Sequence, residues 1–150
     1  MIGKSDEVTT LNTLTTTLID SVNGYRDAAE HSESGRFQQL FRENADERSR
    51  LVEELRAEVR RLGGEPEDDQ STLGQMHQRW LDLKAAIAGR DEKAIINSVE
   101  FGEDYLKEKF ETALDSGHLS GESRAVVERA YQSVRKGHDQ VSSIKHGLEA

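Results

Sequence analysis

The chain of 150 residues contains no cysteine and only one proline. Without cysteine there is no disulfide, no thiolate metal site and no cysteine nucleophile, and the composition suits a reducing compartment, so we expect a cytoplasmic protein. Proline breaks helices, so its scarcity leaves long stretches of the chain free to form uninterrupted helices. The single Pro66 follows Gly63-Gly64-Glu65, and this is the strongest break in the sequence.

Aromatic residues are also scarce, at 5% of the chain, which argues against a β-rich fold. No run of about 18 apolar residues occurs, so no membrane-spanning helix is expected. The first residues lack the apolar region of a signal peptide. Acidic residues outnumber basic ones and give a net charge of −9, which disfavours binding to nucleic acid and to anionic membrane surfaces.

Through most of the chain, apolar residues recur at steps of three and four, the spacing of one helix face. This pattern predicts four long helices over residues 5–31, 34–62, 91–115 and 120–150, with a shorter amphipathic helix over 71–88. Because 33% of the residues are charged, each helix is expected to bury one stripe and to expose a wide polar face.

The predicted helix ends carry recognisable cap residues. Ser34, Asp91 and Ser120 stand where an N-cap is expected, and Gly63 stands where a helix would end in the left-handed conformation. The outer face of the 34–62 segment is expected to be a solvated surface with local ion pairs. This face comprises Glu53, Glu54, Arg56, Glu58, Arg60 and Arg61.

Two long helices, a connection over about residues 63–90 and two further long helices form a single domain over residues 1–150. A helix of about 27 residues is roughly 40 Å long, so the connection must carry the chain back along that length. The second and third long helices then run in the same direction. The sequence therefore predicts an all-α fold, a four-helix bundle with a fifth, shorter helix in the crossover.

Several short segments occur in a recognisable order along the chain: Gly24-Tyr25-Arg26-Asp27-Ala28-Ala29-Glu30, Leu62-Gly63-Gly64-Glu65-Pro66, His77 with Arg79-Trp80 and Leu83-Lys84, Glu100 with Gly102-Glu103-Asp104, and His138-Asp139. This ordered set resembles an uncharacterised bacterial family of ferritin-like four-helix-bundle proteins. The resemblance extends from about Leu11 to Ile144 and implies a ferritin-like fold. The family is a domain of unknown function, so the resemblance implies no established activity.

Proteins of the wider ferritin-like superfamily bind two metal ions with one carboxylate from each of two helices and a Glu-x-x-His motif from each of the others. This chain contains no Glu-x-x-His. Arg50 follows Glu47 at the third position, and Arg135 stands three residues before His138. A standard di-iron site is therefore not expected.

Polar residues nevertheless recur at similar heights in the predicted bundle. They could form a non-standard site for iron, manganese or zinc. The candidate ligands are Glu47, Glu100, Glu103 and His138, and the supporting polar groups of the core are Tyr25 and Asn44. The alternative is a buried hydrogen-bond network, or a stripe edge where charged groups reach solvent, and we favour this alternative, with no bound cofactor.

A second group of interest lies on the crossover segment and comprises His77, Arg79 and Trp80. Trp80 could anchor a partner subunit or close a small-molecule pocket. It could also fill the groove between two bundle helices, with its indole N–H bonded to a backbone carbonyl, and we favour this structural interpretation.

Motifs for nucleophilic catalysis and phosphate binding do not occur. There is no Gly-x-Ser-x-Gly, and Gly63-Gly64 ends a helix instead of opening one after a strand. We therefore expect a non-catalytic structural or interaction protein that forms a homo-oligomer and can bind a protein partner, with a stress-related role by analogy with the superfamily. The alternative is a carboxylate-rich metal-binding or redox protein with its site in the bundle core.

Overall fold

The computed structural model describes residues 4–32, 35–66, 89 and 91–149, and within these ranges it is helical without any strand. The helices are α1 (Lys4–His31), α2 (Gly35–Arg61), α4 (Glu92–Asp115) and α5 (Gly121–Glu149). The four long helices predicted from the sequence are confirmed, with ends within one residue of the predicted ones. The predicted helix over 71–88 lies outside the described residues, and so do His77, Arg79 and Trp80.

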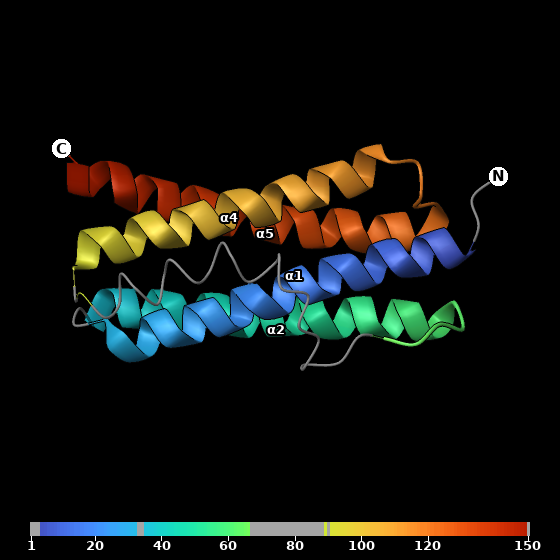
Figure 1. The fold of residues 1–150 in the computed structure, drawn as a ribbon, viewed down its shortest axis with the longest axis horizontal. Helices are drawn as coiled ribbons and strands as arrows, with labels where there is room; N and C mark the ends of the chain where they lie inside the picture. The colour runs from blue at the N-terminus through green and yellow to red at the C-terminus, as the bar shows by residue number, and fades with distance from the viewer. Residues whose placement is uncertain (1–3, 33–34, 67–88, 90, 150) are drawn as a thin grey trace.

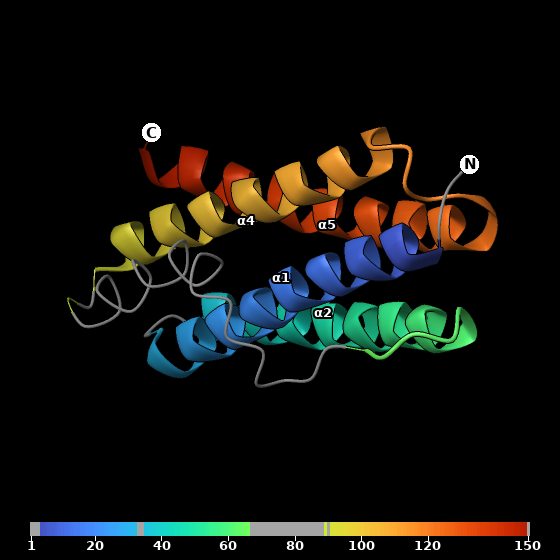
Figure 2. The same cartoon turned by 45° about the vertical axis from the view of Figure 1, so that its right-hand side comes forward.

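The four helices form a bundle of two antiparallel hairpins (Figure 1). The first hairpin joins α1 to α2 and the second joins α4 to α5, with α1 against α4 and α2 against α5. As predicted from the length of the crossover, α2 and α4 run in the same direction, and they lie diagonally across the bundle. A second view shows the same two hairpins stacked on each other (Figure 2). No helix, over the residues described, is long and apolar enough to cross a membrane.

The helix ends follow from local chemistry. Gly63 has a φ of 83°, the left-handed conformation that lets the chain turn away from α2. Asp91 caps α4, and its carboxylate accepts a hydrogen bond from the Lys93 backbone N–H at 3.0 Å. Ser120 stands directly before α5, as predicted for a cap, but its side chain bonds to another helix. Its backbone N–H and its hydroxyl both donate to Oε1 of Glu7, at 2.9 and 3.1 Å. A carboxylate from α1 thus holds the start of α5.

Two clusters of buried apolar side chains fill the core, one towards each end of the bundle. The first includes Leu14, Leu18, Leu55, Phe110 and Val127. The second includes Phe37, Phe41, Ile96, Val99 and Val141. Each cluster draws on all four helices, so burial of apolar area holds the two hairpins together at both ends.

The sequence predicted that one face of α2 is solvated. This prediction is confirmed for Glu54 and Arg60, which are exposed, but it is wrong for Glu58, which is only 4% exposed. The Glu58 carboxylate accepts hydrogen bonds from Arg61 at 2.6 and 2.7 Å and from the Ser123 hydroxyl at 2.5 Å. Position 58 lies beside the buried Val59, on the edge of α2 that faces α5. Sequence spacing predicts a charged residue at a stripe edge to be exposed, because its partner on a helix distant in the sequence cannot be recognised from that spacing.

Candidate functional site

A layer of buried polar side chains lies between the two apolar clusters. Ser21 and Tyr25 come from α1, Arg48 from α2 and Glu103 from α4, and each of these side chains is at most 1% exposed. All four positions continue the three- and four-residue spacing of the apolar stripes, which is why their side chains point inward. The layer is therefore part of the core of the bundle, at the level where all the helices meet.

The centre of this layer is an ion pair between Arg48 and Glu103. Nη1 of Arg48 donates to Oε1 of Glu103 and Nη2 donates to Oε2, both at 2.8 Å, which is the paired geometry that suits guanidinium and carboxylate. Nη1 also donates to the Ser21 hydroxyl at 2.6 Å, and the Tyr25 hydroxyl donates to Oε1 of Glu103 at 2.5 Å. Both carboxylate oxygens are thus satisfied inside the protein, as burial requires.

Burial and the neighbouring charges fix the protonation states of Tyr25 and Arg48. Burial raises the pKa of Tyr25 well above its usual value, and the neighbouring Glu103 carboxylate raises it further, although Arg48 opposes this. Burial by itself would lower the pKa of Arg48, but the charge and hydrogen bonds of Glu103, together with Tyr25 and Glu47, outweigh burial and raise the pKa. Tyr25 therefore remains a neutral donor and Arg48 remains a cation.

Gly137 on α5 completes the layer by having no side chain. A Cβ atom at this position would lie 2.6 Å from Nη2 of Arg48 and 3.8 Å from Oε2 of Glu103. The first distance is shorter than van der Waals contact, so only glycine lets α5 pack against the guanidinium in this arrangement.

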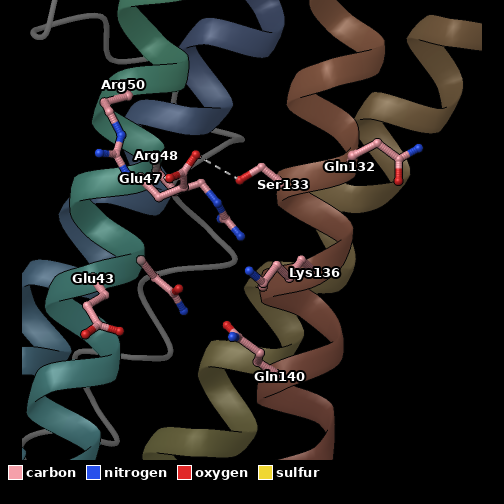
Figure 3. Close-up of a pocket in the computed structure, with 10 residues that line it drawn as sticks. Glu43, Glu47, Arg48, Arg50, Gln132, Ser133, Lys136 and Gln140 are labelled. Carbon is pink, nitrogen blue, oxygen red and sulfur yellow. Dashed lines mark hydrogen bonds and ion pairs between the residues drawn. The ribbon is translucent and has the colours of Figure 1, made fainter.

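The predicted ligands fall into four separate sets of contacts. Only Glu103 belongs to the buried layer, together with Tyr25. Glu47 accepts from Arg50 at 2.5 Å and from the Ser133 hydroxyl at 3.3 Å (Figure 3). Glu100 pairs with Lys145 at 2.8 Å. Burial acts to raise the pKa of Glu100, but Lys145, together with Ser142 and His138, outweighs burial and lowers the pKa.

His138 faces α4, where its Nε2 lies 2.5 Å from Oδ1 of Asp104, while its Nδ1 lies 3.2 Å from Oδ1 of Asp139. Partial burial acts to lower the pKa of His138, but the hydrogen bonds to these two carboxylates outweigh it and raise the pKa above the usual value. The two carboxylates therefore favour the protonated form of the imidazole.

These donors, as arranged, do not fit a bound metal ion. Glu103 already has a cation on both of its oxygens, and the Arg48 guanidinium would repel a second positive charge. Over the described part of the chain, no three His, Asp or Glu side chains are grouped so that they could hold a metal ion. What the layer can do chemically is hold α1, α2 and α4 together through one network of paired hydrogen bonds, against which α5 packs at Gly137.

Arg48 and Ser21 were not among the candidate residues from the sequence, although a signal for Arg48 exists. The buried stripe of α2 passes through Phe41, Ala45, Arg48, Val52 and Leu55, so an arginine interrupts an otherwise apolar face. Such an interruption indicates either a buried pair or a charged group that reaches solvent along the stripe edge.

A groove of about 470 Å³ opens between α2 and α5 beside the polar layer (Figure 3). Arg48 reaches towards α5 from one side, and Lys136 and Gln140 point back towards α2 from the other. Asn44 also lines this groove. Its amide acts weakly to lower the Tyr25 pKa, but its buried Nδ2 has no hydrogen-bond partner in acceptable geometry within the described residues.

A protein-family model matches most of the chain, over the span of α1, α2 and α4. A family model described as "Domain of unknown function (DUF2383)" matches residues 6–116. The match includes Tyr25, Arg48 and Glu103, whereas Gly137 and His138 lie beyond it. No curated protein matches the chain.

Proposed function

The chain belongs to the DUF2383 family, whose description names no activity, and on this premise we propose a function from the bundle itself. The protein is a ferritin-like, non-catalytic structural protein that acts by binding other protein chains, including copies of itself. It works in the cytoplasm. A stress-related setting rests on analogy with the ferritin-like superfamily alone.

The observation that carries this proposal is the Arg48–Glu103 pair in the middle of the core. Ferritin-like metalloproteins place carboxylates in the bundle core and balance their charge with metal ions. Here the guanidinium balances the charge of Glu103, and Tyr25 and Ser21 use the remaining hydrogen-bonding capacity nearby. A core saturated in this way supports a structural role, because no side chain of the layer is left to bind or activate a substrate.

Elemental analysis of protein purified without chelator tests the proposal. We expect no stoichiometric iron, manganese or zinc, and no saturable heat when these ions are titrated into the protein. Stoichiometric metal that is lost from a Glu103→Ala, His138→Ala double variant would replace the proposal with the metal-binding or redox alternative. The four candidate ligands would then have to move together on metal binding.

The oligomer is tested separately by light scattering over a range of protein concentrations. A homo-oligomer gives a mass that is a multiple of the 16.8 kDa chain. A mass of one chain at the highest concentration would remove self-association from the proposal and leave binding to a different protein.

A further inference from the structure

We propose that the groove between α2 and α5 binds a small monocarboxylate that also carries a hydrogen-bond donor. The proposal is independent of the structural role, since the groove lies beside the buried pair and uses other atoms. Its volume of about 470 Å³ is within the range of small-molecule sites, roughly 300–1,000 Å³.

Asn44 supplies the groove with an unused hydrogen-bond donor. Nδ2 of Asn44 is buried and has no hydrogen-bond partner within the described residues, and Asn44 lines the groove. A buried donor without an acceptor is costly, so a ligand oxygen that accepts from it gains the free energy that the protein alone does not recover. A ligand bound beside Asn44 should therefore place a hydrogen-bond acceptor at Nδ2.

The α5 side of the groove carries a positive charge and a polar amide. The ammonium of Lys136 and the amide of Gln140 reach into the gap from α5 (Figure 3). Arg48 lines the groove as well, although its charge is balanced by Glu103. The whole chain carries a net charge of −9, so a general attraction for anions is absent and binding has to come from these local donors.

The acidic residues of the groove favour a monocarboxylate over phosphate. Glu43 and Glu47 stand on the α2 side of the groove, and because Arg50 balances the charge of Glu47, it is the charge of Glu43 that opposes a dianion such as phosphate. The same carboxylates can accept a hydrogen bond from a hydroxyl or amino group of a ligand. A hydroxy acid with a single carboxylate matches both sets of groups. Its carboxylate accepts from Asn44 and Lys136, and its hydroxyl donates to a carboxylate of α2.

The test is a titration followed by ¹H–¹⁵N NMR at constant ionic strength, with L-lactate, propionate and inorganic phosphate as probes. We expect saturable shifts of the Asn44 side-chain amide and the Gly137 backbone amide with lactate, weaker binding of propionate and still weaker binding of phosphate. Lys136→Gln should weaken lactate binding about tenfold, which corresponds to the loss of one charge-assisted hydrogen bond. Lys136 is exposed, so this variant should fold normally.

Lys93→Gln is the matched control, because it removes an exposed lysine from the first turn of α4 and should leave lactate binding unchanged. Shifts that rise linearly without saturation would overturn the proposal. So would equal binding by the parent and Lys136→Gln. Tighter binding of phosphate than of lactate would overturn the ligand class, and equal binding of propionate and lactate would remove the requirement for a hydrogen-bond donor.

Discussion

At the scale of single residues, one glycine decides whether the central ion pair can form. A Cβ at Gly137 would lie 2.6 Å from Nη2 of Arg48. A flexible side chain could move aside, but this guanidinium is held by Glu103 and Ser21 and is almost fully buried. We therefore expect Gly137→Ala to lower the free energy of unfolding by about 1–3 kcal/mol, the usual cost of overpacking a core, as measured by urea denaturation.

The matched control is Gly147→Ala in the same helix. A Cβ at Gly147 meets no atom within 4 Å, so alanine there should be neutral or stabilise the protein by up to about 1 kcal/mol through helix propensity. If both substitutions stabilise the protein equally, Gly137 is not required for close packing of α5 against Arg48.

At the scale of helices, Glu58 links the end of α2 to the start of α5 by accepting a hydrogen bond from the Ser123 hydroxyl. The hydrogen-bonded guanidinium of Arg61 lowers the pKa of Glu58 below its ordinary value of 4.5, and Ser123 lowers it further against the effect of burial. A lowered pKa in the folded state means that the ionised carboxylate stabilises the fold above pH 4.5. That contribution is lost as the pH falls below this value and through the folded pKa.

Glu58→Gln should therefore lower the free energy of unfolding by about 1–2 kcal/mol at pH 7, the value of hydrogen bonds to a charged group. The difference from the parent should shrink as the pH approaches 3, which urea denaturation across a pH series would measure. Glu54→Gln on the exposed face of α2 is the control and should change little at either pH. A Glu58→Gln difference that is the same at both ends of the series would mean that ionisation of Glu58 does not contribute.

The helices themselves could be predicted because their signals are local. Apolar spacing, Gly63 after α2 and Asp91 before α4 lie within a few residues of the structure that they determine. The partner of Arg48 could not be predicted in the same way, because Glu103 lies on the diagonal helix and 55 positions away in the chain. Glu58 was misplaced for the same reason, since Ser123 is 65 positions away.

At the scale of the whole molecule, the polar layer divides an apolar core into two clusters. A bundle of long apolar stripes can slide or rotate with little loss of buried area, whereas a paired charge satisfies its hydrogen bonds in one alignment only. Because Arg48 and Glu103 come from the two hairpins, their pairing fixes how the hairpins stack. We infer that the layer contributes more to the uniqueness of the fold than to its stability.

Two variants separate these contributions. Arg48→Met leaves the Glu103 carboxylate buried without a cation and should cost about 3–5 kcal/mol of stability in urea denaturation. Arg48→Met with Glu103→Leu removes both charges and should recover most of that loss, because replacing a whole buried pair by apolar residues is often neutral. Tyr25 then lacks its acceptor, so recovery should be incomplete by about 1 kcal/mol.

If the pair sets the alignment, the double variant should remain helical but give broadened or duplicated ¹H–¹⁵N NMR peaks. A single set of sharp peaks from the double variant would show that apolar packing alone is enough to align the two hairpins.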